Sequence, residues 1–254
     1  MALTLRYSQY NASVLTTGLD ILRILAETGK PLTATAIAER VGLHVSNVSR
    51  TLRVLSAHGY VRKPSYHSFA PDLGVLALAG SAVMQLPLIK HSRDPLIRIA
   101  GSSGLQATLA TLHRDQVLYL HRAQPSGHCL SGVAGGFPLH LSVVGLRLLM
   151  DLPAKEALAA LERARARYGW ERPSARCPTD PPSCLKALPG LCRDGVLRTD
   201  HWLDGSGFAA AVSIHLPDQP PLALSLDGPG ERDHQSTLLQ AAGLLKTHLL
   251  EYLT

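Results

Sequence analysis

The feature that most constrains the fold of this chain is the order of segments between residues 14 and 69. Apolar residues at helical spacing predict a helix over 13–29, a second over 33–42 and a third over 45–58. Two short runs within 60–69, joined by Pro64-Ser65-Tyr66, predict a small two-stranded hairpin. Three helices followed by a hairpin form a winged helix-turn-helix, a DNA-binding unit.

The third predicted helix carries two contrasting faces. Val48, Leu52 and Leu55 form its apolar stripe, so the opposite face is polar and cationic. In this kind of unit the second helix of the turn enters the major groove, and the hairpin lies along the backbone or minor groove. Asn47 and Arg50 are the candidates for reading base edges, because an amide matches adenine and a guanidinium matches guanine. His44 and Val45, at the entrance of the helix, are further candidates for base contacts. The candidates for phosphate contacts are Ser46, Ser49, Arg53, Arg62 and Lys63.

The charge distribution agrees with a DNA partner for the N-terminal third. The chain of 254 residues has a formal charge of +6, and residues 1–80 hold eight Lys/Arg against four Asp/Glu, which is +4 of that total. A clustered positive charge favours a polyanion. The alternative interpretation of the same face is a solvated polar surface on an ordinary small helical domain.

The rest of the chain predicts a linker and a mixed domain, giving an α+β fold class. The expected parts are a DNA-binding domain at 1–72, a helical linker at 73–100 interrupted at Pro87, and a sensing domain at 101–254. In the last part we expect strands at 106–112, 116–120, 207–216 and 221–226, and helices at 141–150, 154–168 and 234–253. The segment 171–189 is expected to be a loop, because it holds Pro173, Pro178, Pro181, Pro182 and Pro189.

The run SVLTTGLDILRILAETGKPLTATAIAERVGLHVSNVSRTLRVLSAHGYV, followed by HSFAPDLGVLALAG, resembles the isocitrate-lyase-regulator (IclR) family of transcription factors. The resemblance continues more weakly through residues 136–140 with Gly145, through 205–213, and through 224–229. It implies a GAF-like effector domain, a palindromic double-stranded operator, a homodimer or homotetramer, and a response to small organic acids or aromatic metabolites.

The resemblance also implies a ligand pocket, carried over position by position to Cys129, Phe137, Val143, Val144, Phe208, Ser225 and Asp227. Several of these positions depart from the family pattern. Val143, Val144 and Phe208 are larger and more apolar than usual, which favours a flat apolar or aromatic effector. Asp227 stands where a serine is frequent, and a buried carboxylate repels an anionic ligand unless it is protonated or turned away. The alternative is that these side chains only fill a core and that the pocket is closed.

Other classes of protein are less well supported. The sequence holds no G-x-S-x-G elbow and no close grouping of nucleophile, base and orienting residue, so we expect no enzyme and no cofactor. The four cysteines do not have zinc-site spacing, so we expect free thiols and no metal. Without a membrane-length apolar run or a signal-peptide pattern, we expect a cytoplasmic protein. The rival that we keep is an enzyme in the C-terminal domain, with the N-terminal module as an interaction part.

Overall fold

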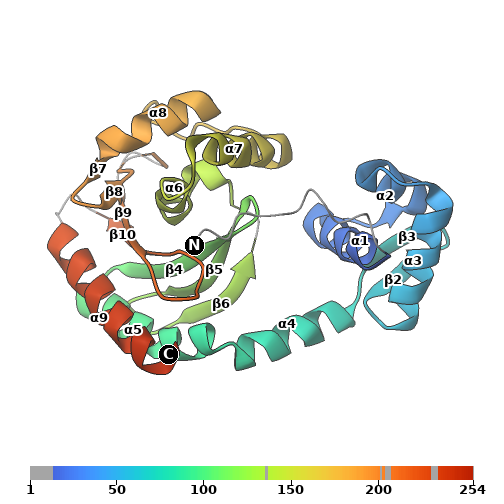
Figure 1. Cartoon of the computed structure of the whole chain (residues 1–254), viewed down its shortest axis with the longest axis horizontal. Coiled ribbons are helices and arrows are strands. Elements are labelled where there is room, and N and C mark those ends of the chain that lie inside the picture. The colour runs from blue at the N-terminus through green and yellow to red at the C-terminus, as the bar shows by residue number, and fades with distance from the viewer. Residues whose placement is uncertain (1–13, 135–136, 201, 204–206, 230–233, 254) are drawn as a thin grey trace. The chain divides into compact units, whose positions relative to one another are not determined.

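A computed structural model describes residues 14–134, 137–200, 202–203, 207–229 and 234–253 (Figure 1). The chain divides into two compact units, 1–82 and 83–254. The division falls inside the helix Leu73–Gln85 (α4), so most of α4 belongs to the N-terminal unit and the helix Pro87–Ser103 (α5) to the C-terminal one. Residues 1–13 of the expected DNA-binding domain lie outside the described residues.

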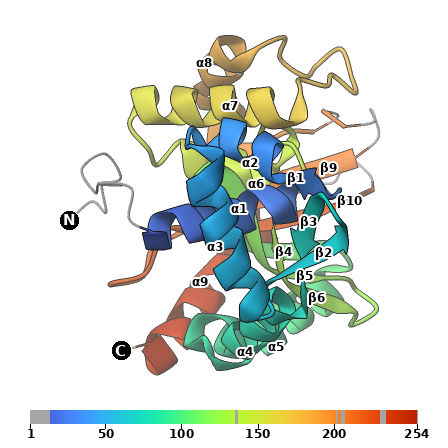
Figure 2. The same ribbon diagram turned by 90° about the vertical axis from the view of Figure 1, so that its right-hand side faces the viewer.

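The N-terminal unit is the predicted winged helix-turn-helix. Its elements are α1 (Val14–Thr28), β1 (Leu32–Thr33), α2 (Ala34–Val41), α3 (Val45–Ala57), β2 (Val61–Ser65), β3 (Ser68–Pro71) and most of α4 (Leu73–Gln85). The three strands form one small antiparallel sheet in the order β1-β3-β2. Ile21, Ile37 and Leu52, from three different helices, are fully buried together in the core between them. Figure 2 shows α1 and α2 packed on α3, with the hairpin following the end of α3.

The helix boundaries follow from local chemistry. The Thr33 hydroxyl accepts a hydrogen bond from the Ala36 backbone N–H (3.1 Å) and so caps α2. Gly42 closes α2 with a positive φ of 70°, which glycine adopts without steric cost. These two signals keep the connection between α2 and α3 short, as a helix-turn-helix requires.

The C-terminal unit has a seven-stranded antiparallel sheet in the order β6-β5-β4-β10-β9-β8-β7. Its strands are β4 (Gln106–His113), β5 (Gln116–Ala123), β6 (Cys129–Ala134), β7 (Cys192–Arg193), β8 (Val196–Arg198), β9 (Gly207–Ile214) and β10 (Leu222–Pro229). Besides α5, its helices are η1 (Leu139–Leu141), α6 (Val143–Leu149), α7 (Ala154–Tyr168), α8 (Pro181–Leu191) and α9 (Gln235–Leu253). α5 and α9 cover one face of the sheet, and α6, α7 and α8 cover the other (Figure 1). Layered helix and sheet of this kind fit the expected GAF-like domain.

A bulge in β5 changes which side chains face which layer. Leu109 pairs with His121 and the next residue, Ala110, pairs with Tyr119, so Leu120 is an extra residue in the strand. Before the bulge, Tyr119 faces the layer of α6. After it the alternation reverses: Arg122 lies on the same side as Tyr119, whereas His121 faces α5.

Two predictions about this unit need correction. The segment 171–189 is not all loop, because α8 begins at Pro181. Pro181 and Pro182 occupy the first helical turn, where no N–H is needed, and the Asp180 carboxylate accepts a hydrogen bond from the Ser183 N–H (2.8 Å) as the cap. Strands β6, β7 and β8 were not predicted either; β7 and β8 hold only two and three residues, too few for a clear alternating pattern.

No single helix of the described chain is long and apolar enough to cross a membrane. The pair α4 and α5 reaches that length and composition only when the two helices are taken together. α5 buries Ile89, Leu96 and Ala100 in the core of the C-terminal unit.

Candidate DNA-binding surface and effector cavity

α3 presents the predicted DNA-reading face to solvent. Asn47, Arg50 and Arg53 are exposed, whereas Val48 and Leu52 on the opposite side are fully buried. Neither Arg50 nor Arg53 forms a hydrogen bond or ion pair with any described residue, so both guanidinium groups are available to a partner. Val45 and Ser46 are exposed at the start of the helix, and Ser49 is half-buried on its flank.

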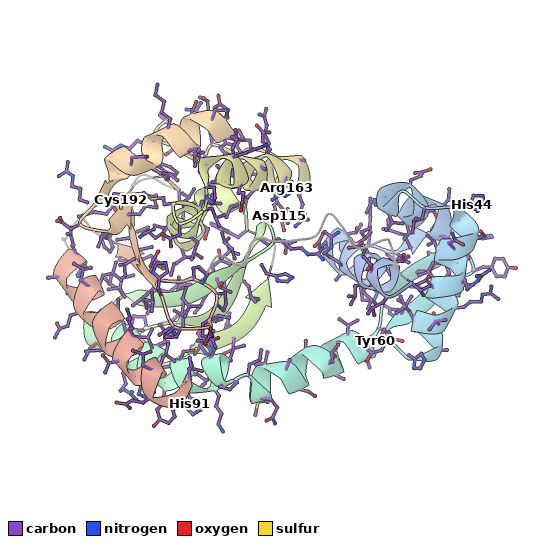
Figure 3. The ribbon with its side chains drawn as sticks, viewed as in Figure 1. His44, Tyr60, His91, Asp115, Arg163 and Cys192 are labelled. Carbon is purple, nitrogen blue, oxygen red and sulfur yellow. The ribbon has the colours of Figure 1, made fainter. Side chains whose placement is uncertain are left out.

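His44 has a structural task that the sequence did not suggest. It is the residue before α3, and its Nδ1 lies 2.8 Å from the Ser46 hydroxyl and accepts a hydrogen bond from the Ser46 N–H (3.4 Å). This contact caps the helix. Figure 3 shows His44 at the entrance of α3. Because these two side chains are in contact, they would lie together at a DNA surface bound by α3.

The hairpin carries the two remaining basic candidates. Arg62 donates from Nε to the Pro71 carbonyl (3.3 Å), which holds its guanidinium along the strand pair. The Lys63 ammonium lies 5.5 Å from the centre of the Tyr66 ring and 5.3 Å from that of Phe69. Cation–π contacts of this kind hold a lysine in place without neutralising its charge. Both side chains are exposed, as phosphate contacts require.

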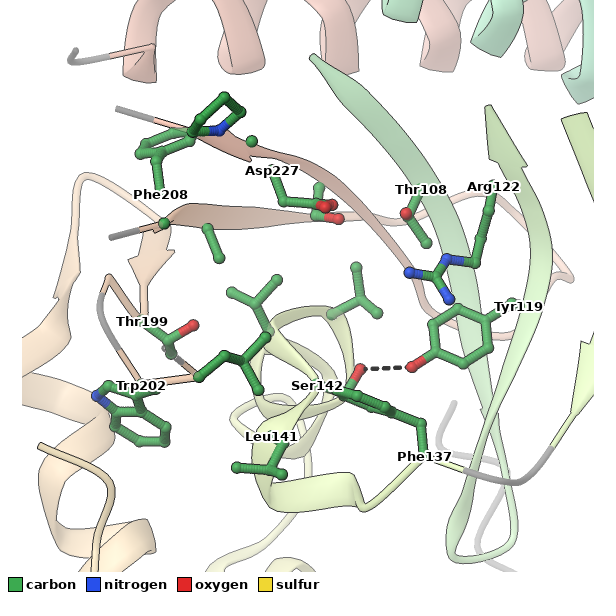
Figure 4. Close-up of a pocket in the computed structure, with 18 residues that line it drawn as sticks. Thr108, Tyr119, Arg122, Phe137, Leu141, Ser142, Thr199, Trp202, Phe208 and Asp227 are labelled. Carbon is green, nitrogen blue, oxygen red and sulfur yellow. Dashed lines mark hydrogen bonds between the residues drawn. The ribbon is translucent and has the colours of Figure 1, made fainter. Parts of the chain in front are cut away.

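The C-terminal unit contains a cavity of about 310 Å³ between its sheet and the layer of η1 and α6 (Figure 4). Six of the seven predicted ligand residues line it: Phe137, Val143, Val144, Phe208, Ser225 and Asp227. The sequence did not point to the other lining residues, which are Thr108, Tyr119, Arg122, Leu141, Ser142, Thr199, Trp202, Leu203, Gly207, Ala209, Gly228 and Pro229. The volume is at the lower end of ligand cavities, about 300–1,000 Å³.

Cys129 does not belong to this cavity, which corrects its place among the predicted ligand residues. Its Sγ lies 3.9 Å from Nδ1 of His121, and its side chain packs against the core on the α5 side of the sheet. His121 in turn contacts the Ile89 carbonyl of α5 through Nε2 (2.8 Å). The thiol therefore lies across the sheet from the cavity, and burial raises its pKa.

Strand register assembles the polar floor of the cavity. Thr108 on β4 pairs with Arg122 on β5 and with Ser225 on β10, so these three side chains form one row across the sheet. The Tyr119 hydroxyl donates to the Ser142 hydroxyl (3.1 Å), the cap of α6, and this bond closes one end (Figure 4). Of these polar residues only Ser225 was a candidate from the sequence.

Arg122 brings a positive charge into the cavity. Its guanidinium carbon lies 5.2 Å from the centre of the Tyr119 ring, and its Nε is buried without a hydrogen-bond partner among the described residues. The bulge at Leu120 is the reason that the sequence did not reveal it. Simple alternation from Tyr119 would place His121 in the cavity and Arg122 on the other face.

Asp227 is the buried carboxylate that the sequence predicted in the cavity. Its Oδ2 accepts a hydrogen bond from the Gln106 side chain (2.8 Å). Burial raises the pKa of Asp227 to about 6, and the positive charge of Arg122 and the Gln106 hydrogen bond oppose that rise. Asp227 was expected to repel anionic ligands. The positive charge of Arg122, which the sequence did not place in the cavity, opposes that repulsion.

Catalytic and metal chemistry have little support in this cavity. Among its lining residues in the described chain there is no histidine or cysteine, and the Tyr119 and Ser142 hydroxyls bond to each other. No group of three His, Cys, Asp or Glu side chains in the described ranges could hold a metal ion. The four cysteines are free thiols; Figure 3 shows Cys192 at the end of α8.

The chain combines a winged helix-turn-helix, whose recognition helix is exposed and cationic, with a second unit that contains a cavity. These features are those of a DNA-binding transcriptional regulator with a cavity in its C-terminal unit. The comparisons with known proteins narrow this class.

Residues 14–65 match the IclR helix-turn-helix domain. A curated relative, the HTH-type transcriptional regulator BhcR of Paracoccus denitrificans, is 29% identical over 220 residues, 83% of this chain and 75% of that protein. An IclR family regulator from Brucella abortus has a similar structure, with a TM-score of 0.70 at 23% identity over 96% of this chain and 91% of that one. An IclR homologue from Microbacterium hydrocarbonoxydans, complexed with 4-hydroxybenzoate, gives a TM-score of 0.64 at 24% identity over 93% and 99%. The N-terminal module therefore matches the IclR helix-turn-helix type, and the chain as a whole is similar to IclR-type transcriptional regulators.

Proposed function

We propose that this regulator binds a palindromic operator as a homodimer or homotetramer, with α3 of each copy in the major groove. The observation that carries the proposal is the exposed face of α3, where Arg50 and Arg53 have no partner among the described residues. Asn47 and Arg50 read bases, with His44 and Val45 at the edge of the site. Ser46, Ser49, Arg53, Arg62 and Lys63 contact phosphates and fix the register.

We propose a separate role for each of the three parts of the sequence. Residues 1–72 bind DNA, residues 73–100 connect the two domains, and residues 101–254 bind an effector. The effector occupies the cavity lined by Phe137, Val143, Val144, Phe208, Ser225 and Asp227. The Microbacterium homologue that holds 4-hydroxybenzoate supports a small-molecule effector on this fold. Binding changes operator affinity by a coupling of about 1–3 kcal/mol. The chain catalyses no reaction and acts in the cytoplasm, where the operator is.

Selection of bound sequences from a random duplex pool tests the DNA-binding proposal. We expect a palindrome to be enriched, with half-sites about 34 Å apart. Failure to enrich any sequence, with only weak salt-sensitive binding, would contradict it and would move the search to the rival enzyme. A turnover assay on ligands that raise the melting temperature separates the two, because an effector is recovered unchanged.

Two matched variants assign the roles on the selected operator. Arg50→Ala should cost about 1–3 kcal/mol on the preferred site and relax the preference at one base position. Lys63→Ala should weaken binding to all sequences equally and lower the salt slope by about 1, because it removes a single phosphate contact. If Arg50→Ala kept full specificity, the face of α3 assigned to base reading would be wrong.

A further inference from the structure

The C-terminal unit has a second pocket, with a volume of about 800 Å³, lined by residues of α8, β7, β8 and the start of α9. Figure 1 shows α8, β7 and β8 near one another at the edge of the sheet opposite β6. Three arginines line this pocket, Arg176, Arg193 and Arg198, and the one acidic residue among its described lining residues is Asp200. The described lining therefore carries two more positive than negative charges.

Two of the three arginines have no partner in the described chain. Arg176 and Arg193 are exposed, and neither forms a hydrogen bond or ion pair with any described residue. Their guanidinium groups are therefore available to a ligand. A guanidinium binds phosphate oxygens through two parallel hydrogen bonds, and a phosphate monoester carries about two negative charges at neutral pH. Two unpaired arginines in one pocket match that charge.

The third arginine is held in place by the protein. Nε and Nη2 of Arg198 lie 3.0 Å and 2.7 Å from Oδ2 of Asp200, and Oδ1 of Asp200 accepts a hydrogen bond from the Ala209 N–H (3.3 Å). The guanidinium carbon of Arg198 also lies 5.1 Å from the centre of the Phe208 ring. Asp200 thus neutralises Arg198, and the excess positive charge of the described lining comes from the two exposed arginines.

The backbone around the two exposed arginines is ordered by contacts within the unit. In the loop that carries Arg176, Nε of Arg172 donates to the Cys177 carbonyl (3.0 Å), and the Ser174 hydroxyl donates to the Trp202 carbonyl (3.1 Å). The other arginine lies on β7, which pairs with β8. A site that is ordered in advance loses less conformational entropy when a ligand binds.

Beside these charged groups the pocket has an apolar wall. Leu191, Val196 and Trp202 line it, together with Ala187. Trp202 also lines the effector cavity, so the two sites share one side chain. An apolar wall next to two arginines favours an organic phosphate over inorganic phosphate, because the carbon skeleton buries apolar surface on binding.

We propose that this pocket is a second ligand site, which binds a small organic molecule carrying a phosphate monoester. Arg176 and Arg193 bind the phosphate, and Leu191, Val196 and Trp202 contact the carbon skeleton. The site goes beyond the proposed function, because it is separate from the binding site in the effector cavity and from the DNA-reading face of α3. The phosphates of a DNA backbone are diesters with a single charge each, so they match two unpaired arginines less well.

Calorimetric titration of the full chain with two matched probes tests the ligand class. Phenyl phosphate is a monoester, and methyl phenyl phosphate is the corresponding diester, with a single charge. We expect phenyl phosphate to bind about tenfold or more tightly than the diester, since the loss of a charged hydrogen bond has that effect. Equal binding of the two probes, or no binding of phenyl phosphate, would overturn the proposal.

Variants of the two exposed arginines locate the bound phosphate. Arg176→Gln and Arg193→Gln should each weaken phenyl phosphate binding about tenfold. Both variants should keep the wild-type melting temperature, because neither side chain has a partner in the described chain. Arg163→Gln is the matched control, since Arg163 is exposed on α7 and does not line the pocket. It removes the same charge and should bind phenyl phosphate as the wild type does.

Two outcomes of this variant series would refute the site. If Arg163→Gln weakened binding as much as Arg176→Gln does, phenyl phosphate would respond only to the general charge of the surface. If Arg122→Gln abolished binding while Arg176→Gln and Arg193→Gln retained it, the phosphate would lie in the effector cavity instead. The titration does not involve the operator, so its result leaves the proposed function to be judged by the selection experiment.

Discussion

At the scale of single residues, the cavity of the C-terminal unit is marked by a buried carboxylate with a raised pKa. Asp227 is held among Arg122, Tyr119 and Gln106, and burial raises its pKa from 3.8 to about 6. Ionisation of Asp227 therefore costs free energy in the folded protein that it does not cost in the unfolded chain.

This shift predicts a pH-dependent stability difference between the wild type and Asp227→Asn. Between about pH 4 and 6 the native state keeps a proton that the unfolded state has released, so the contribution of Asp227 to stability falls as the pH rises. Asparagine keeps an oxygen for Gln106 and carries no charge. The C-terminal unit of the variant should thus be more stable than wild type at pH 7.5, by on the order of 2–3 kcal/mol, and nearly equal at pH 4.

Melting temperatures followed by circular dichroism from pH 4 to 8 measure this difference. Glu162→Gln, on the exposed side of α7, is the control for removing one carboxylate, and its difference from wild type should not follow the same pH window. A variant of Asp227 that was less stable than wild type at pH 7.5 would show that the ionised carboxylate is held by interactions stronger than those described.

At the scale of elements, close approach of α6 to β5 depends on a glycine. A Cβ placed on Gly145 would lie 2.6 Å from Cγ2 of Val117 and 2.7 Å from Cδ1 of Leu139. Both neighbours belong to the core beneath the cavity, so neither can move without disturbing its packing.

Gly145→Ala should therefore destabilise the C-terminal unit by about 1–3 kcal/mol, the usual cost of overpacking a core. Gly243→Ala on α9 is the matched control. Gly243 is exposed within a helix and has no atom within 4 Å of its added Cβ, so alanine should stabilise by up to about 1 kcal/mol. Denaturant unfolding measures both, and opposite signs are the expected result. If both variants changed the free energy of unfolding by the same amount, α6 would be free to shift on the sheet.

The sequence predicted elements well where their signals were local. Thr33, Gly42 and the stripe of Val48 and Leu52 mark the helix-turn-helix directly, and the structure confirms that fold. α8 was missed because five prolines in 171–189 suggested a loop, although two of them occupy positions where proline suits a helix.

The cavity was predictable only in part, because its floor depends on pairing between distant strands. Positions such as Phe137 and Val143 came from the family resemblance and do line the cavity. Arg122 could not be placed in this way, since the bulge at Leu120 reverses the alternation of β5. Cys129 also came from the family resemblance, but on the edge strand β6 it packs on the α5 side of the sheet, away from the cavity.

At the scale of the whole molecule, α4 exposes an apolar surface that a single copy leaves uncovered. No residue of this helix is buried, and Leu73, Leu76 and Met84 are 75%, 68% and 72% exposed. Their spacing of three and eight residues, with Gly80 between, places them along one side of the helix. A palindromic operator requires two recognition helices related by twofold symmetry, so a second copy of the chain is the partner that we propose for this stripe.

Leu76→Glu tests that assembly. A glutamate in the middle of the stripe removes apolar area, and pairing of two copies would bury its charge. The molar mass of the variant, measured by sedimentation, should therefore be closer to that of one chain, 27.2 kDa, than the molar mass of the wild type is. Its affinity for the full palindrome should fall toward its affinity for a single half-site, because the two half-sites are then bound independently. Leu244→Glu, a matched change at a leucine of α9 that is 65% exposed, should alter neither property. If Leu76→Glu kept the wild-type mass and the wild-type preference for the full site, the copies would pair through another surface, and the exposed apolar residues of α1, Leu15 and Leu19, would be the next to change.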